Sequence, residues 1–154
     1  MPDIDWTDPT AKISANFTVR EACYLPSWQI MHTPSAAEQA RILVAAQYME
    51  AVRAFLERPI NVHVWIRPVS VNCPGSPYHG RNYNALVGGA PQSAHITGDA
   101  VDWNPYSMGC EEARYLLLPK LAEMGLRMEN RAGSNWVHLD NRTPPPKGNR
   151  FFLP

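Results

Sequence analysis

Prolines are the feature of this chain that most restricts its fold. Fifteen of the 154 residues are proline, about twice the usual share. Each proline fixes its own φ angle and lacks the N–H group that a helix interior or a central strand requires. The sequence therefore predicts many rigid loops and few long helices, which favours a loop-rich domain of the α+β class.

A long helix is predicted over residues 35–57, directly before Pro59. Ser35 and Glu38 have the spacing of a capping box, in which each side chain binds the other residue's backbone N–H group. Apolar residues then recur at helical spacing, which predicts one buried face. They are Ile42, Ala45, Ala46, Met49, Val52, Phe55 and Leu56. A second amphipathic helix is predicted over 110–125.

Three strands are predicted, over 60–67, 99–103 and 135–140. The first alternates along its length, so that Val62, Val64 and Ile66 lie on one face and His63, Trp65 and Arg67 on the other. In the last strand, Trp136, His138 and Asp140 share a face. These strands and the two helices predict a small antiparallel sheet backed by helices.

The remaining segments are expected to be irregular. A loop over 68–92 is rich in Gly, Pro, Asn and Tyr, and loops of this length in a compact domain are more often functional than idle. The tail over 141–154 is too rich in proline to be regular, and its Phe151, Phe152 and Leu153 are expected to pack on the body or on a neighbour. We expect a single domain over 1–154, with its core over about 17–140.

Composition excludes several classes of protein. Fourteen basic residues balance fourteen acidic ones, which gives no electrostatic footprint for nucleic acid or for an anionic membrane. No stretch approaches the ~18 apolar residues of a membrane span. The first residues, MPDIDWTDPT, lack the apolar segment of a signal peptide, so we expect synthesis in the cytoplasm without one. The three cysteines form no CxxC pair and are expected to be buried or free thiols.

The stretch SAHITGDAVDW, residues 93–103, holds the residues best suited to chemistry. His95 leads through a corner at Gly98 into a strand that carries Asp102, and His138 lies in another strand between apolar neighbours. If these strands are neighbours, two imidazoles and a carboxylate converge, which is the composition of a catalytic zinc site. The other interpretation is an ordinary loop entering a buried strand, with polar residues that only satisfy backbone groups.

The same residues resemble a known family. SAHITGDAVDW is similar to the Ser-x-His-x-x-Gly-x-Ala-x-Asp signature of the zinc D-alanyl-D-alanine carboxypeptidases and of the related phage L-alanyl-D-glutamate endopeptidases, which cut peptidoglycan stem peptides. WVHLD resembles their Trp-x-His motif, and the resemblance covers roughly 17–140. It implies a fold of the hedgehog and D-alanyl-D-alanine peptidase type, with the site in a groove on the sheet.

The resemblance also implies roles for individual residues. His95, Asp102 and His138 fall on the metal ligands, and Zn²⁺ is the implied cofactor. Arg67 falls on an arginine that binds the substrate or stabilises the oxyanion, which suits a guanidinium. Ser93 falls on the motif serine and is expected to make a hydrogen bond to the substrate or to a neighbouring side chain. Gly88 and Gly89 are expected to give the loop a tight turn.

The general base is where the sequence departs from the family. Many members carry an acidic residue three positions before the last histidine, and others a histidine two positions before it; here these positions hold Asn135 and Trp136. Asparagine cannot accept a proton from water. Some relatives carry a glutamate further upstream, and the stretch LRMEN offers Glu129 in a similar setting. Asp140 is the other candidate replacement, and loss of the base is the third possibility.

Two functions are therefore carried forward. The first is a zinc metallopeptidase that hydrolyses peptidoglycan stem peptides, as a phage endolysin or virion-associated lysin acting at the bacterial cell wall. The second is a zinc-binding module that has lost catalysis and serves as a structural or binding component of a phage particle, with phage structural proteins as partners. The absence of a carboxylate at Asn135 favours the second; a carboxylate within one water of the metal would favour the first.

Overall fold

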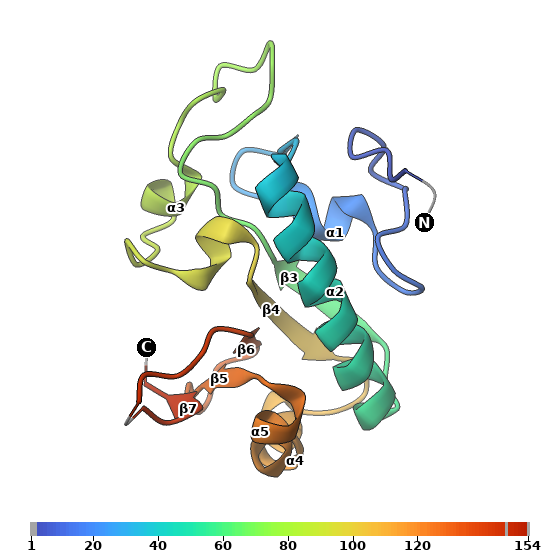
Figure 1. The fold of residues 1–154 in the computed structure, drawn as a ribbon, viewed down its shortest axis with the longest axis vertical. Coiled ribbons are helices and arrows are strands. Elements are labelled where there is room, and N and C mark those ends of the chain that lie inside the picture. Colours follow the sequence, from blue (N-terminus) through green and yellow to red (C-terminus); the bar gives the residue numbers. More distant parts are fainter. Residues whose placement is uncertain (1–2, 147, 154) are drawn as a thin grey trace.

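A computed structural model describes residues 3–146 and 148–153 and has the expected α+β architecture (Figure 1). Its main sheet has five strands in the order β3-β4-β6-β5-β7. The strands are β3 (Ile60–Val64), β4 (Ala100–Pro105), β6 (Val137–Asp140), β5 (Arg127–Glu129) and β7 (Phe151–Phe152). Three of them, β3, β4 and β6, form the antiparallel sheet that the sequence predicts. The sequence does not predict β5, which extends this sheet antiparallel to β6, or β7, which is added parallel to β5. A short hairpin of β1 (Tyr24–Leu25) and β2 (Ile30–Met31) lies apart from this sheet.

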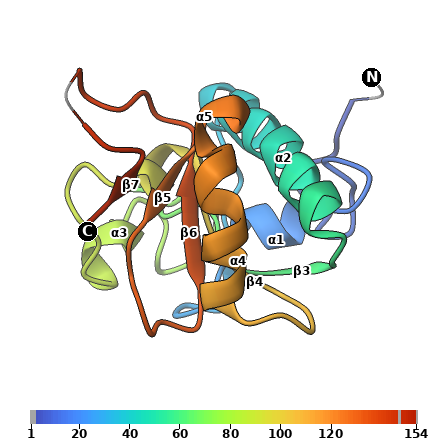
Figure 2. The same ribbon diagram turned by 90° about the horizontal axis from the view of Figure 1, so that it is seen from below.

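The long predicted helix is confirmed as α2 (Ala36–Leu56), with Ser35 as its N-cap and a complete capping box to Glu38. A second capping box, between Thr18 and Glu21, begins the short α1 (Val19–Cys23). In Figure 2, α2 lies beside the α4–α5 segment, and α4 (Cys110–Leu117) contacts both β4 and β6. The helices therefore cover the sheet and leave its other face available for the site.

The sheet separates an apolar face from a polar one. In the β4–β6 ladder, Val101 pairs with Leu139 and Asp102 pairs with His138. Because side chains alternate along a strand, the first pair enters the core, where both residues are fully buried, and the second pair lies on the opposite face. Period-two alternation thus presents two of the predicted metal ligands on one surface of adjacent strands.

Two details of the predicted apolar faces are wrong. The alternation over 60–67 ends early, because β3 stops at Val64 after a register shift, and Trp65 and Ile66 are both fully buried. The indole N–H of Trp65 donates to the carbonyl of Gly98, which ties this segment to the corner beside the site. In α2, Phe55 is 38% exposed rather than on the buried face.

The predicted helix over 110–125 is interrupted. Pro119 lies in a 3-10 turn, η2 (Leu118–Lys120), which separates α4 from the single turn α5 (Leu121–Met124). Proline lacks the N–H group for an α-helical hydrogen bond, so the helix changes to a tighter turn at this point. Gly125, with φ of +68°, ends the segment as predicted.

Two other segments are more regular than predicted. The loop over 68–92 contains one helical turn, α3 (Tyr83–Leu86), capped by the side chain of Asn82. The tail is not wholly irregular, because Phe151 and Phe152 form β7 at the edge of the sheet. Among the described residues, no helix combines the length and the apolar character needed to cross a membrane.

Candidate metal centre

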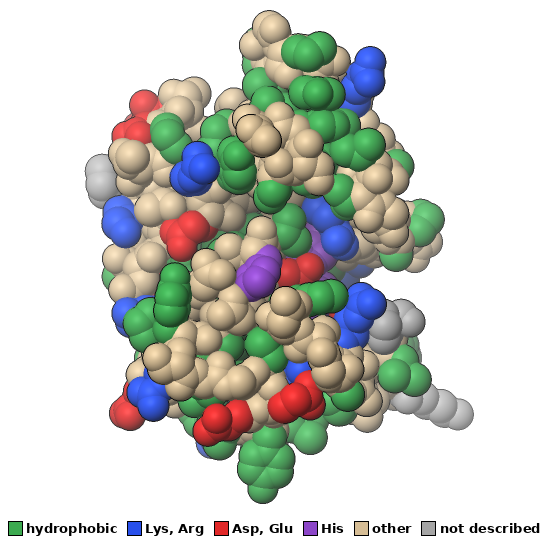
Figure 3. Space-filling model, turned by 180° about the vertical axis from the view of Figure 1, so that it is seen from behind, with side chains coloured by type: hydrophobic (Ala, Val, Ile, Leu, Met, Phe, Trp, Pro, Cys, Tyr) green, Lys and Arg blue, Asp and Glu red, His purple; other side chains and the backbone are tan. Residues whose placement is uncertain are grey.

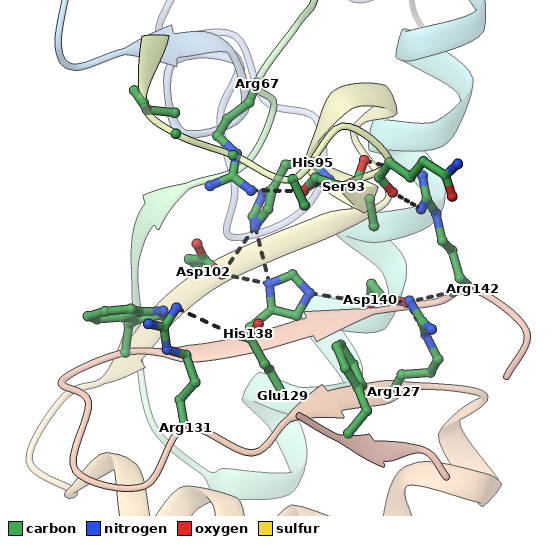
Figure 4. A pocket seen from close by; sticks show the side chains of 18 residues that line it. Arg67, Ser93, His95, Asp102, Arg127, Glu129, Arg131, His138, Asp140 and Arg142 are labelled. Atoms are coloured by element: carbon green, nitrogen blue, oxygen red, sulfur yellow. Dashed lines mark hydrogen bonds and ion pairs between the residues drawn. The ribbon is translucent and has the colours of Figure 1, made fainter. Parts of the chain in front are cut away.

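The predicted site residues line a pocket of about 490 Å³ on the polar face of the sheet. Figure 3 shows a hollow on the side opposite to Figure 1, where histidine, acidic and basic side chains gather. His95, Asp102 and His138 form the floor of the site, with Arg67, Ser93 and Glu129 around them (Figure 4). The fold therefore brings the site residues predicted from the sequence together in one pocket, although they come from segments that are far apart in the chain.

Three atoms that could bind a metal ion, two imidazole nitrogens and one carboxylate oxygen, meet at the centre of this pocket. Nδ1 of His138 lies 2.8 Å from Oδ1 of Asp102 and 3.2 Å from Nε2 of His95. Nε2 of His95 lies 3.2 Å from the same Asp102 oxygen. His95 comes from the 3-10 turn η1 (Ala94–Thr97), which Ser93 begins and Gly98 ends. The glycine corner thus brings His95 back over the strand that carries Asp102.

The second nitrogen of each histidine has a partner that fixes the tautomer. Nδ1 of His95 lies 2.6 Å from the carbonyl oxygen of Trp65, which can only accept, so this nitrogen carries the proton. Nε2 of His138 lies 3.3 Å from Oδ2 of Asp140, which accepts in the same way. In the neutral histidines, both remaining lone pairs therefore point at Asp102.

This arrangement requires a positive charge at its centre. Two imidazole lone pairs and a carboxylate oxygen are all acceptors, and such a group is stable only around a proton or a cation. In a tetrahedral zinc site with bonds of about 2.0–2.1 Å, neighbouring ligand atoms lie about 3.3 Å apart. The observed separations of 2.8 to 3.2 Å fit that requirement with little movement. Among the described residues, the side chains of His95, Asp102 and His138 form a group whose ligand atoms all lie within 4.8 Å of one another, which is close enough to hold a metal ion.

The electrostatics of the metal-free protein agree with this geometry. Burial alone would lower the pKa of His138, but hydrogen bonds to Asp102 and Asp140 raise it to about 9. Burial alone would raise the pKa of Asp102, but the charge of His95 and the hydrogen bond from His138 hold it well below its usual value. Burial lowers the pKa of His95. A proton on His138 thus occupies the position that a metal ion would take.

Asp140 lies behind His138 and is fully engaged. Besides His138, its carboxylate accepts from Nε and Nη2 of Arg127, at 2.8 and 2.9 Å, and from the backbone N–H of Arg142, at 2.9 Å. Its side chain is 1% exposed. Asp140 therefore orients His138, in the manner of the carboxylates that support metal-binding histidines, and has no oxygen free for water.

Glu129 enters the pocket from β5 and points toward the three donors (Figure 4). Its side chain is 14% exposed, and Nη1 of Arg131 lies 4.0 Å from its carboxylate. Arg131 in turn lies over the ring of Trp136, 5.2 Å from its centroid. Of the two candidate bases, Glu129 is the one with a carboxylate that remains available inside the pocket.

Arg67 and Ser93 lie together at another wall of the pocket. Nη2 of Arg67 donates to Oγ of Ser93 at 2.8 Å, and the backbone N–H of Arg67 donates to the carbonyl of His95. Ser93 Oγ also accepts from the backbone N–H of His95, as the cap of η1. Arg67 has no carboxylate within 4.0 Å among the described residues, so its charge is available to an anionic ligand.

The glycine pair on the loop also borders the pocket. Gly88 has φ of +70°, which is the left-handed turn that was predicted. Gly89 is required by packing, because a Cβ atom there would lie 2.0 Å from Oδ1 of Asn84. The buried amide of Asn84 donates to the carbonyls of Gly89 and Ala90 and so holds the loop against the site.

Other residues of the pocket have roles that the sequence alone does not reveal. Asn135 is exposed and lines a neighbouring groove, whereas Trp136 lines the pocket itself. Arg127, Arg142 and Phe152 also line it, and none of them stands out in the sequence. Arg127 was detectable only through the strand register, because it lies opposite Asp140 in the β5–β6 ladder.

Comparison with known protein families gives a result that agrees with this geometry. Residues 16–140 match the family model described as Peptidase M15, a span that includes the three converging donors, Arg67 and Glu129. A comparison with curated proteins gives no match. The matched span is most of the chain, and the chain therefore belongs to the peptidase M15 family, the zinc peptidases of the D-alanyl-D-alanine carboxypeptidase and endopeptidase type.

Proposed function

We propose that this protein is a zinc-dependent peptidase that hydrolyses peptide bonds in peptidoglycan stem peptides. The observation that carries the proposal is the convergence of three acceptor atoms within 2.8 to 3.2 Å in a pocket that is also lined by the carboxylate of Glu129 and the guanidinium of Arg67. His95, Asp102 and His138 would hold the metal. A zinc ion there supplies Lewis-acid activation of water and of a peptide carbonyl.

Glu129 is proposed as the general base. Its carboxylate faces the donors from the adjacent strand and is held only by the distant contact to Arg131. It would accept a proton from the attacking water and pass it to the leaving amine. Asp140 is less suited to this role, because both of its oxygens already accept hydrogen bonds on the far side of His138.

Arg67 is proposed to bind the negative charge of the substrate. A guanidinium without a carboxylate partner suits either a substrate carboxylate or the oxyanion that forms during hydrolysis. Ser93 keeps the guanidinium turned into the pocket through the 2.8 Å hydrogen bond to Nη2. This pair would therefore orient the peptide against the metal.

We further propose that the protein acts at the bacterial cell wall, as a phage endolysin or as part of a virion. The resemblance of residues 93–103 to the phage L-alanyl-D-glutamate endopeptidases supports this. The alternative is a zinc-binding module of a phage particle without catalysis. The exposed Asn135 favours that alternative, since it replaces the acidic residue of many family members.

Digestion of purified peptidoglycan distinguishes the zinc peptidase from the zinc-binding module without catalysis. Zinc-loaded wild-type protein is expected to release new amino groups. Glu129→Gln is expected to lower the rate by about 10² to 10⁴-fold, the usual contribution of a general base. Glu123→Gln, which changes an exposed carboxylate of α5, serves as the matched control and should keep the wild-type rate. No release from protein that contains one zinc ion per chain would instead support the structural module.

A further inference from the structure

The tail of the chain contributes to a site that the family match does not fully contain. The match ends at residue 140, yet Arg142 and Phe152 both line the pocket. Arg142 donates from Nη1 to the carbonyl of Gln92 and from Nη2 to that of Ser93. The tail is therefore fixed at its start to the segment that carries His95.

The far end of the tail is fixed to the sheet. β7 pairs in parallel with β5, so that Phe152 lies beside Glu129. The backbone N–H of Asn130 donates to the carbonyl of Phe152 at 2.6 Å, and that of Met128 donates to Arg150 at 2.7 Å. Alternation along the strand turns Phe151 to the core and Phe152 to the pocket.

The ring of Phe152 contacts both side chains that flank Asp140. The imidazole of His138 lies 6.1 Å away between ring centroids, in an edge-to-face arrangement with an interplanar angle of 89°. The guanidinium carbon of Arg127 lies 4.8 Å from the centroid of the same ring, within the range of a cation–π contact. Phe152 therefore limits how far either partner of Asp140 can move.

We propose that Phe152 is a positioning residue of the metal site, which holds Arg127 against Asp140 and the ring of His138 in its metal-binding orientation. The proposal deepens the proposed function and rests on it for the identity of the metal. Replacing a residue that hydrogen-bonds to a metal-binding histidine commonly lowers metal affinity by about 10 to 100-fold. Phe152 contacts such a residue instead of donating to or accepting from the histidine, so its replacement is expected to act at the lower end of that range.

Zinc affinity, measured by competition with a chelator, tests this directly. Phe152→Ala and Phe152→Leu are expected to weaken zinc binding about tenfold, because both remove the ring. Phe152→Tyr keeps the ring and should bind zinc within about twofold of the wild type. Leu153→Ala, which shortens the next side chain of the tail at a position 76% exposed, should bind as the wild type does. If Phe152→Ala does not fold, as judged by circular dichroism, the comparison of the Leu and Tyr variants decides.

Kinetics separate positioning from direct contact with the substrate. Phe152→Ala and Phe152→Leu are expected to have a lower kcat than the wild type at limiting zinc, and their kcat is expected to return to the wild-type value when zinc is in excess. Unchanged zinc affinity in folded Phe152→Leu, with a raised KM, would make Phe152 only a wall of the substrate pocket and would overturn the proposal. Zinc affinity needs no substrate, so an absence of hydrolysis in every variant would contradict the proposed function alone.

Discussion

Arg127 and Asp140 face each other across the β5–β6 ladder, and two hydrogen bonds of 2.8 and 2.9 Å join the guanidinium to the carboxylate. Asp140 is held from behind while its Oδ2 faces Nε2 of His138. The pair therefore fixes the orientation of one imidazole of the proposed metal site. Because its oxygens already accept hydrogen bonds, Asp140 is less suited than Glu129 to the proposed role of general base.

Replacing Asp140 is expected to weaken the metal site without removing a ligand. Asp140→Asn keeps the shape of the side chain but loses the charge that holds the proton on Nε2 of His138, so zinc affinity should fall about 10 to 100-fold. Asp99→Asn is the matched control, because Asp99 is also buried and paired with an arginine, Arg41, but makes no hydrogen bond to a histidine among the described residues. An equal loss of zinc affinity in both variants would contradict a specific role for Asp140.

Zinc binding is expected to release a proton at neutral pH. The pKa of His138 in the metal-free protein is about 9, so the imidazole is protonated below that pH and must lose its proton to bind the metal. Apparent zinc affinity should therefore fall about tenfold for each pH unit below 9, until other groups titrate. Calorimetry at pH 7.5 in buffers of different ionisation enthalpy measures the proton count directly. Binding without proton release would show that His138 is neutral in the metal-free site.

The corner at Gly98 is expected to tolerate no side chain. Gly98 has φ of +84°, and a Cβ atom there would lie 2.8 Å from Cγ1 of Ile42 in α2. Gly98→Ala therefore adds overpacking, about 1–3 kcal/mol, to the strain of the backbone. Gly133→Ala has nearly the same φ, +79°, with open space around it, and isolates the strain alone.

Thermal or urea unfolding of the two glycine variants measures the difference in the free energy of unfolding. Gly98→Ala is expected to be the less stable, and to bind zinc more weakly because His95 lies three residues before the corner. Equal stability of the two variants would mean that Ile42 moves aside without cost.

The sequence predicts the centre of this site better than its surroundings. His95, Asp102 and His138 are predictable because period-two alternation and one glycine corner are local rules, and adjacent strands then bring the residues together. The capping box at Ser35 is local in the same sense. The sequence does not predict strand Phe151–Phe152, because the strand it pairs with, β5, lies more than twenty residues earlier in the chain. Only the tertiary fold shows that the edge of β5 is open to it.

Errors of the prediction have similar causes. Trp65 and Ile66 are both buried because the chain leaves the sheet after the register shift in β3, which alternation cannot anticipate. Pro119 is a local signal against a continuous helix, and the apolar periodicity on both sides of it concealed the break. The role of Arg127 depends on strand register, which is set by pairing rather than by the strand's own residues.

Stepwise addition of zinc to the metal-free protein, with release of amino groups from purified peptidoglycan as the readout, tests the central claim most directly. The wild type is expected to gain activity in proportion to zinc and to reach a plateau at one zinc ion per chain. His138→Ala should neither retain zinc nor release amino groups, whereas His63→Ala, outside the pocket, should match the wild type. Hydrolysis that persists after zinc is removed, or a His138→Ala variant that binds zinc and cleaves as the wild type does, would contradict the account.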